Sequence, residues 1–296
     1  MKRLALLSLQ ILFWVGFFGL SPLAAQVEED PTSFYWQGLS HLEKKEYLQA
    51  IRHFTTAISL NNAYAEAYYQ RAIAKNALNK ELGYLSIEHC HDLIKAMNGG
   101  KPEAAEMLLE HVAAECFSLQ AAKMQPKIVF CADFSTHGLT EIPANITDFP
   151  FIVQLNLAEN ELTTLDSALA RLENVLVLDL NNNRLNELSA NFSQLSHLQF
   201  LNLSDNNLKE LNSDFGNLKN LRVLQIKNNY LSELPLSFEK LENLENLDIS
   251  YNQLSQVPAV LLRLQNLREL HIEGNAIPKE EIEKIRTALP KTEIFF

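Results

Sequence analysis

The sequence predicts a repeat solenoid of the α + α/β class, in which an all-α segment of helical hairpins precedes a stack of turns with one short parallel strand each. Two observations predict this. From residue 129 onward, leucines and asparagines recur every 23 residues, and before that point small and aromatic residues recur at the spacing of paired helices. Such self-similarity is the sequence signature of repeat architectures. We therefore expect a leader over residues 1–25, a helical domain over 26–126 and a repeat domain over 127–296.

The leader is typical of a cleavable bacterial export signal. Lys2 and Arg3 supply positive charge, residues 4–20 are almost wholly apolar, and small residues precede Gln26. The alternative is an uncleaved membrane anchor, but two polar residues interrupt the apolar run, which is shorter than the ~20 residues that a spanning helix needs. We expect an exported mature chain, located in the periplasm, on the cell surface or in the medium, with no membrane span after cleavage.

Residues 31–64 carry small and aromatic side chains where two antiparallel helices would approach closely, and residues 65–98 repeat this pattern less regularly. A third helical stretch is expected over Pro102–Lys123, after a break at the glycine pair that follows Asn98. The spacing resembles that of the tetratricopeptide-repeat family. The residues that carry the resemblance in the first unit are Phe34, Tyr35, Gly38, Tyr47, Ala50, Phe54 and Ala57.

Helical repeats of this kind need at least about three units to be stable. With fewer here, we expect the helical domain to pack against the first turn of the second domain and to cap it. The resemblance also suggests a carboxylate clamp of Lys and Asn on the first helices. Tyr35, Leu39 and Gln70 stand at those positions, so we expect an apolar or aromatic contact there instead.

The second domain repeats the pattern L-x-x-L-x-L-x-x-N-x-L without insertion or deletion. Alternation in the central L-x-L predicts a short strand whose leucines point to one side. A single turn cannot bury these leucines, whereas stacked turns bury them in one continuous core. The seven copies begin at Val129, Ile152, Val175, Leu198, Leu221, Leu244 and Leu267.

The asparagine of each copy is expected to be structural. A buried amide must be hydrogen-bonded, and stacked amides can pair with the backbone of adjacent turns. His137 takes this position in the first copy, where we interpret it as a capping variant and not as an active-site histidine. After the last copy, Pro278 opens a helical cap over Lys279–Leu289, and Thr292–Phe296 is expected to add an edge strand. The asparagines are Asn160, Asn183, Asn206, Asn229, Asn252 and Asn275.

These repeats resemble the leucine-rich-repeat family, in its 23-residue class with a Leu-Pro step, over about residues 127–296. The resemblance implies a curved solenoid that carries a parallel sheet on its concave face and binds its ligand there. On that face we expect an apolar stripe, Val177-Phe200-Val223, bordered by amides and carboxylates, which is the layout of an interface with an aromatic anchor and a polar rim. The alternative is that exposed Val and Phe merely favour the strand. The residues expected to bind a partner are Val177, Asp179, Phe200, Asn202, Val223, Gln225, Lys227, Asn246, Asp248 and Tyr251.

No catalytic, metal-binding or cofactor-binding residues are predicted. The sequence lacks the nucleophile-elbow, Walker and dinucleotide-binding motifs, and its nine glycines disfavour a phosphate-cradling loop. His89-Cys90-His91 is the densest cluster of potential metal ligands, but adjacent helical residues diverge. The concave carboxylates could be considered for calcium, but carboxylates on separate strands seldom supply six close oxygens, so we expect a solvated acidic face.

Charge and cysteine content narrow the partners and the compartment. The formal net charge of −11 disfavours nucleic acid and anionic lipid, which attract clustered cations. Export permits disulfides, and a Cys90–Cys116 bond is one expectation. The favoured interpretation is that Cys90, Cys116 and Cys131 are all small buried side chains.

We therefore expect a non-enzymatic module that binds a protein or peptide on its concave face. The alternative is a structural assembly scaffold of an envelope complex that acts through the helical domain. A third hypothesis is an effector enzyme resembling the ubiquitin ligases that carry leucine-rich repeats; such an enzyme needs a further catalytic domain, and the repeats leave no room for one before residue 296.

Overall fold

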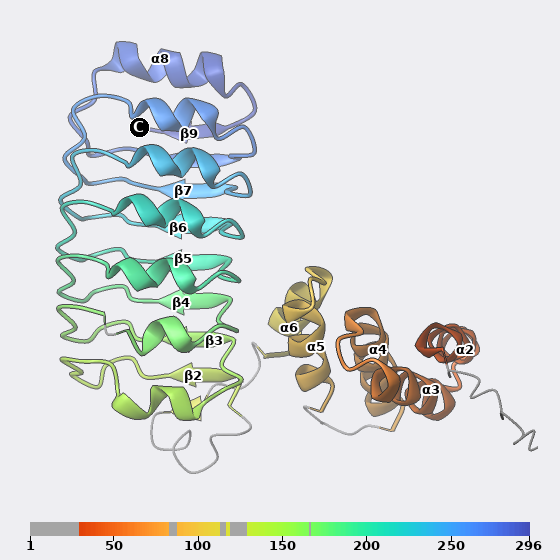
Figure 1. Cartoon of the computed structure of the whole chain (residues 1–296). Helices are drawn as coiled ribbons and strands as arrows, with labels where there is room; N and C mark the ends of the chain where they lie inside the picture. Colours follow the sequence, from red (N-terminus) through yellow and green to blue (C-terminus); the bar gives the residue numbers. More distant parts are fainter. Residues whose placement is uncertain (1–29, 83–87, 113–116, 119–128, 166) are drawn as a thin grey trace, which may run out of the picture.

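The computed structural model describes residues 30–82, 88–112, 117–118, 129–165 and 167–296. A group of helices stands beside a solenoid of stacked turns (Figure 1). The predicted leader lies outside the described residues. Within the described part of the chain, no helix is both long enough and apolar enough to cross a membrane.

The helical part contains five described helices. The first begins where its sequence provides a start signal: Asp30 stands before it, accepts a hydrogen bond from the backbone N–H of Thr32 at 2.9 Å, and is followed by Pro31 at the first helical position. The helices are α2 (Pro31–Glu43), α3 (Tyr47–Leu60), α4 (Ala65–Leu82), α5 (Glu88–Asn98) and α6 (Glu103–Val112).

The first two helices form a tight hairpin. Lys44–Glu46 connect them, so the helices must run antiparallel. A Cβ added to Gly38 of α2 would lie 2.5 Å from the ring of Phe54 on α3. Only glycine leaves room for this ring, which is fully buried. The close approach expected from the small-residue pattern is thereby confirmed, whereas the resemblance to tetratricopeptide repeats stays a prediction.

A buried carboxylate joins the next two helices. Asp92 of α5 accepts hydrogen bonds from Arg71 of α4 at 2.6 and 2.9 Å, and Lys75 lies 3.0 Å away. Because a bidentate guanidinium–carboxylate pair fixes both distance and orientation, this cluster sets how α4 and α5 pack. It has a structural role.

The solenoid is built on a nine-stranded parallel sheet whose strands follow one another in chain order. Equivalent residues of successive repeats are paired, as in Leu178↔Leu201 and Leu201↔Leu224, so the 23-residue spacing becomes the register of the sheet. The strands are β1 (Phe117–Ser118), β2 (Cys131–Asp133), β3 (Gln154–Asn156), β4 (Val177–Asp179), β5 (Phe200–Asn202), β6 (Val223–Gln225), β7 (Asn246–Asp248), β8 (Glu269–His271) and β9 (Glu293–Phe295).

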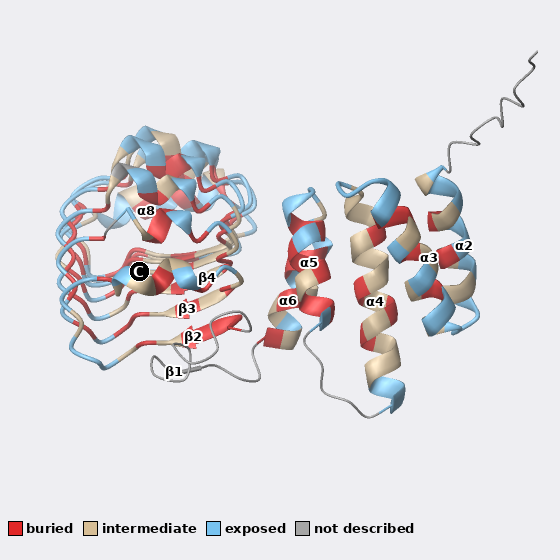
Figure 2. Cartoon of the chain, turned by 60° about the horizontal axis from the view of Figure 1, so that its bottom comes forward, coloured by how far each residue is buried: buried red, intermediate tan, exposed pale blue. Residues whose placement is uncertain are grey.

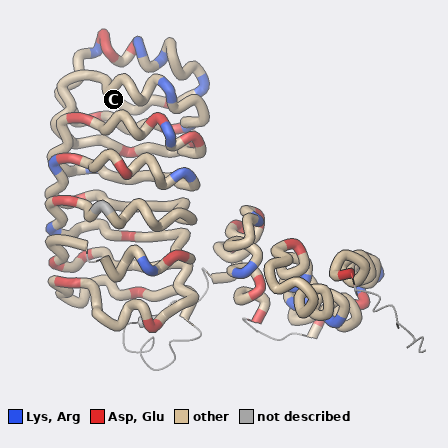
Figure 3. Tube along the Cα trace, viewed as in Figure 1, with Lys and Arg blue, Asp and Glu red and all other residues tan. Residues whose placement is uncertain are grey.

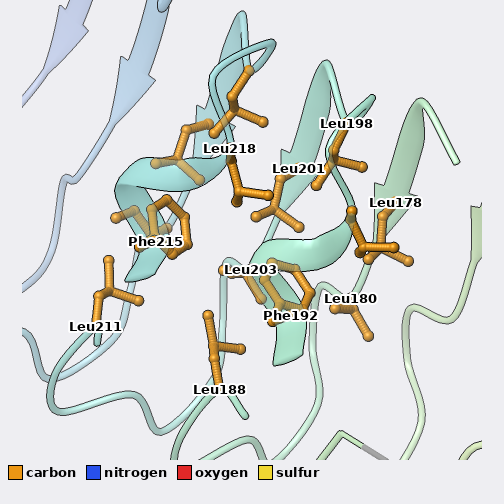
Figure 4. Close-up of a cluster of buried hydrophobic side chains, with 14 of the residues drawn as sticks. Leu178, Leu180, Leu188, Phe192, Leu198, Leu201, Leu203, Leu211, Phe215 and Leu218 are labelled. Atoms are coloured by element: carbon orange, nitrogen blue, oxygen red, sulfur yellow. The ribbon is translucent and has the colours of Figure 1, made fainter. Parts of the chain in front are cut away.

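The core of the solenoid lies between this sheet and a row of short 3₁₀ helices on the opposite side. The middle residue of each strand from β3 to β8 is buried, and phenylalanines from the 3₁₀ helices close the core, with Phe215 stacked on Phe238 at 5.2 Å. Figure 4 shows leucines of neighbouring turns packed with Phe192 and Phe215. The 3₁₀ helices are η2 (Ala144–Asp148), η3 (Leu169–Arg171), η4 (Ala190–Gln194), η5 (Ser213–Asn217), η6 (Leu236–Lys240) and η7 (Ala259–Arg263).

The asparagines form the predicted ladder. In a typical rung, the side-chain amide of Asn206 donates to the carbonyls of Leu180, Leu203 and Ser204 at 3.0 to 3.1 Å. Its oxygen accepts the N–H of Leu185 at 3.0 Å. Each rung therefore satisfies backbone groups of its own turn and of the preceding turn, and the structural role is confirmed.

Both ends of the ladder are closed. His137 is exposed, and its backbone N–H donates to the Asn160 side chain at 3.1 Å, which agrees with a capping role. At the other end, α8 (Lys279–Ala288) follows Pro278 and buries Ile282 and Ile285 against the last turn, and β9 adds the final strand. The predicted carboxy-terminal cap is confirmed.

The helical stretch predicted over Pro102–Lys123 is too long. Helix α6 ends at Val112, and Phe117–Ser118 already pairs with β2 as the first strand of the sheet. The sheet therefore begins inside the segment assigned to the helical domain, because two residues are enough to pair with an existing edge and carry no alternation that could reveal them. The boundary between residues 126 and 127 stays a prediction.

The helical part packs against the start of the first strands, as Figure 2 shows from below the solenoid. Apolar residues of α4, α5 and α6 form one buried cluster with Phe130, Cys131, Val153 and Leu176 of the solenoid. His91 of α5 contacts the rings of Phe130 and Phe151 edge-on, at 5.2 and 4.4 Å. The expected contact with the first turn is confirmed, but the helices lie beside the strand starts of several turns (Figure 1), so their role as a cap of the first turn stays a prediction.

The interpretation that all three cysteines are simply small buried side chains is wrong for one of them. Cys131 is disulfide-bonded, so it is not simply a small buried side chain. Cys90 is a free, buried thiol, which excludes the alternative Cys90–Cys116 bond. Cys116 lies outside the described residues. Spacing alone could not identify the bonded cysteine, because disulfide pairing depends on how close the side chains lie in the folded chain.

We expect Asn206→Leu to lower the free energy of unfolding by about 3 kcal/mol, because it leaves buried carbonyls and an N–H without partners. Urea unfolding followed by circular dichroism measures this loss. Asn207→Ala, at the adjacent amide outside the ladder, is the control and should cost less than about 0.5 kcal/mol. Equal losses in the two variants would contradict the structural role of the ladder.

The oxidised mature chain should contain one thiol when denatured and three after reduction, since Cys131 is bonded and Cys90 is free. In the folded chain this thiol should react slowly, because burial raises the pKa of Cys90 to about 11. Titration with a chromogenic disulfide reagent measures both. A Cys90→Ser variant that still shows a thiol before reduction would sink this assignment.

Candidate functional site

The predicted apolar stripe exists on the concave face. Val177, Phe200 and Val223 open three consecutive strands, β4 to β6, and pair with one another in register. Each is half-buried, while the next residue along the strand is fully buried in the core. Strand alternation therefore aims the three side chains outward together, as the sequence predicts.

Helix α6 turns this stripe into a pocket. A cavity of about 220 Å³ lies between Leu109 of α6 and the stripe. Leu109 and Val177 also pack against the apolar cluster that joins the helices to the solenoid. The stripe is therefore the floor of a site to which both parts of the chain contribute. The lining residues are Leu109, Val177, Gln199, Phe200, Arg222, Val223, Glu245 and Asn246.

Three apolar lining residues and Asn246 were predicted from the sequence, whereas Leu109 and the polar residues Gln199, Arg222 and Glu245 were not. The residues of α6 that are buried against the neighbouring helices are Ala104, Ala105, Leu108 and Val112. Leu109 adjoins this side and is only half-buried. A single extra leucine beside an amphipathic face is a weak signal, and nothing in the sequence indicates that it faces a strand more than sixty residues later.

A charged network borders the pocket. Arg222 binds Glu245 at 2.8 and 2.9 Å and reaches Glu106 of α6 at 3.4 Å, and Arg268 lies 3.1 Å from Glu245. Exposed pairs of this kind contribute at most about 1 kcal/mol each. Their main effect is to orient the guanidinium of Arg222 between α6 and the sheet, where it forms part of the rim.

Polar residues follow the stripe two positions further along the strands. Asp179, Asn202, Gln225 and Asp248 form one row through the same register. The Asp179 carboxylate accepts the N–H of Asn181 at 2.9 Å. Burial raises the pKa of Asp179, and hydrogen bonds from Asn181 and Asn202 partly oppose this effect. A half-buried carboxylate thus stands beside the apolar stripe.

Asp248 is held in a similar way. Its carboxylate accepts hydrogen bonds from the backbone N–H and the hydroxyl of Ser250, at 3.0 and 2.6 Å. Among the described residues, no Lys, Arg or His forms a salt bridge with Asp179 or Asp248. The row beside the stripe therefore presents two carboxylates without an internal cation.

The last two predicted residues lie beyond the carboxyl ends of the strands. Tyr251 adopts a φ of +54°, a left-handed conformation that is uncommon for an aromatic residue. The Lys227 ammonium lies 5.1 Å from its ring centroid. A Cβ added to Gly274 would approach the ring to 2.6 Å, so the ring rests on glycine. Tyr251 is half-exposed and separate from the pocket residues along its strand.

The arrangement offers an apolar pocket with a polar rim. In the described parts of the chain, no three His, Cys, Asp or Glu side chains converge as a metal site would require. The predicted divergence at His89-Cys90-His91 is visible in the rings: that of His89 lies against His111 at 4.8 Å, whereas that of His91 lies against Phe151.

Comparisons with known proteins agree with the fold. The sequence model of a family described as "Leucine-rich repeat region" matches residues 155–289. A leucine-rich-repeat protein of Leptospira interrogans is similar, with 28% sequence identity and a TM-score of 0.51 over 59% of this chain and 51% of that chain. An internalin of Listeria monocytogenes shares 24% identity, with a TM-score of 0.47 over 53% of this chain and 44% of that chain. No curated protein matches the chain.

The one-strand turns, the asparagine ladder and the family match define the class as a leucine-rich-repeat solenoid. Residues 155–289 match the leucine-rich-repeat region, and a helical segment precedes the repeats. It spans about half the length of the solved structures named above.

We expect Asp179→Asn to make the folded chain more stable at pH 7. The folded-state pKa of Asp179 is raised, so ionisation costs stability above that pKa, and the cost disappears below the unfolded pKa of about 3.9. Asparagine keeps an acceptor for the Asn181 N–H without the charge.

Urea unfolding at pH 7 and pH 3 tests this expectation. The gain over the wild type should be present at pH 7 and should vanish at pH 3. Asp214→Asn, at an exposed position of η5, is the control and should show little gain at either pH. If the Asp179→Asn variant is less stable than the wild type at pH 7, the ionised carboxylate stabilises the fold, and the prediction is wrong.

Proposed function

We propose that this chain is a non-enzymatic protein-interaction module that binds a protein or peptide on the concave face of its repeats. The pocket between Leu109 and the Val177-Phe200-Val223 stripe carries this proposal. Solenoids present extended concave surfaces to their ligands, and the leucine-rich-repeat match supports this class of function. An apolar anchor site with a polar rim is the arrangement in which interface energy concentrates.

The remaining predicted residues extend the proposed interface along the strands. Asp179, Asn202, Gln225 and Asp248 supply hydrogen-bonding and charged groups beside the pocket, and Lys227 and Tyr251 add an aromatic contact beyond the strand ends. No cofactor or metal is needed for recognition of this kind.

A second candidate is an assembly scaffold that acts through the helical part. Trp36 of α2 and Leu48 of α3 are 66% and 61% exposed, and large apolar side chains on neighbouring helices can mark a protein contact. Helices α2 and α3 lie at the end of the helical part that is farther from the solenoid (Figure 1). The two candidates therefore use different surfaces and can be separated by substitution.

We also propose that the chain is exported. The charged and apolar leader supports this, and so does the disulfide at Cys131, because disulfides persist in oxidising compartments and are rare in reducing ones.

We expect Phe200→Glu combined with Val223→Lys to abolish partner capture by the mature chain. The two changes place charges in an apolar pocket but keep the net charge. The measurement is affinity capture from native envelope and culture supernatant, with circular dichroism to confirm folding. Tyr230→Lys with Leu236→Glu, at residues 48% and 79% exposed, is the matched control with the same charge change.

A partner retained by the control and lost by the stripe variant supports binding on the concave face. A partner retained by both contradicts it and directs attention to Trp36 and Leu48.

A further inference from the structure

The pocket on the concave face has the size and polarity for one large apolar side chain. Its volume is about 220 Å³, and an apolar cavity of roughly 150 Å³ already accommodates a benzene ring. Leu109, Val177, Phe200 and Val223 form its apolar surface. The polar groups at the rim, Arg222 and Glu245, already bind each other. The interior therefore favours an aliphatic or aromatic group and offers no unpaired charge to it.

Two carboxylates beside the pocket lack a cation partner, whereas the arginines at its rim are paired. Asp179 and Asp248 stand in the row next to the stripe without a cation partner among the described residues. Charged positions recur along the whole solenoid in Figure 3, and the chain as a whole carries a formal charge of −11. A second copy of so acidic a chain would be repelled, whereas a cationic segment would be attracted.

The distance between the two features suits a short extended peptide. Val177 and Asp179 lie two residues apart on the same strand face, which corresponds to about 6.6 Å. Side chains two residues apart in an extended peptide also point to one side at this spacing. A peptide along the strand direction can therefore place an apolar side chain in the pocket and a cation beside Asp179.

We propose that the junction of α6 and the concave sheet binds an extended peptide segment in which a large apolar residue stands two positions from a Lys or Arg. The apolar side chain enters the pocket under Leu109, and the cation pairs with Asp179. This proposal rests on concave-face binding but adds two statements: the helical part supplies a wall of the site, and the ligand is basic.

The raised pKa of Asp179 agrees with this assignment. The fold holds the carboxylate in a partly desolvated place where its charged form is disfavoured. A bound cation would remove that disadvantage. Asn156 and Asn202 occupy the same position in the adjacent repeats, so the repeat itself does not require a carboxylate there.

Selection of random heptapeptides displayed on phage, with the immobilised mature chain as bait, tests the proposal. We expect the selected peptides to carry a Leu, Met or aromatic residue two positions from Lys or Arg. A selected peptide is then synthesised with a fluorophore, and its dissociation constant is measured by anisotropy for the chain and its variants. Selection of acidic peptides overturns the proposal.

Two variants test separately the contribution of Leu109 to the pocket and the pairing of Asp179 with the peptide cation. Leu109→Glu should weaken binding at least about tenfold, as loss of an anchor contact does, whereas Leu82→Glu, at an exposed position of α4, should not. Asp179→Asn should weaken binding about three- to tenfold. This loss should disappear for a peptide whose Lys or Arg is replaced by Gln. An equal loss for the Gln peptide overturns the cation pairing.

The outcomes also distinguish this proposal from the underlying function. Suppose that Phe200→Glu with Val223→Lys abolishes peptide binding while Leu109→Glu leaves it unchanged. The concave face then binds the ligand, and the composite pocket is wrong. A selection that yields no binder, or binders equally bound by the stripe variant, overturns concave-face binding together with this inference. Circular dichroism of each variant shows whether a loss reflects unfolding.

Discussion

The constant 23-residue spacing between backbone-paired turns is the constraint on which the rest of this structure depends. Each turn hydrogen-bonds to the next through one strand and one asparagine, so equivalent residues such as Leu178 and Leu201 lie side by side. A single inserted residue would shift the ladder and the leucine core together. The same register brings Val177, Phe200 and Val223 into one row. The proposed binding surface is thus a direct consequence of the stacking.

The contact between the helices and the first strands adds a residue of the helical part to the pocket, which the repeats alone do not supply. The described helices bury only small clusters of their own, and one of these clusters is completed by residues of the solenoid. Each part covers the other, with His91 seated against Phe130 and Phe151. This packing brings α6 to the stripe, so that Leu109 lines the same pocket. The contact that joins the two parts of the chain therefore also forms the pocket.

Most of the solenoid could be predicted because its information is periodic. The ladder, the strand register and the cap after Pro278 all follow from residues at fixed spacing, and the stripe follows from alternation along three strands. The residues that escaped prediction take part in contacts between the two parts of the chain. Leu109, the bonded state of Cys131 and the short strand at Phe117–Ser118 depend on where the helices lie on the sheet, and no repeat encodes that placement.

A pocket built by both parts of the chain requires that α6 is held in a fixed position beside the concave sheet, and a distance between the two parts tests this most directly. Spin labels at Glu110→Cys on α6 and Lys219→Cys on the solenoid, both exposed positions, in a Cys90→Ala background, allow a pulsed electron-resonance measurement. The account predicts one narrow distance distribution in the unreduced chain. A broad distribution would show that the helices move freely against the repeats and would contradict a pocket built by both.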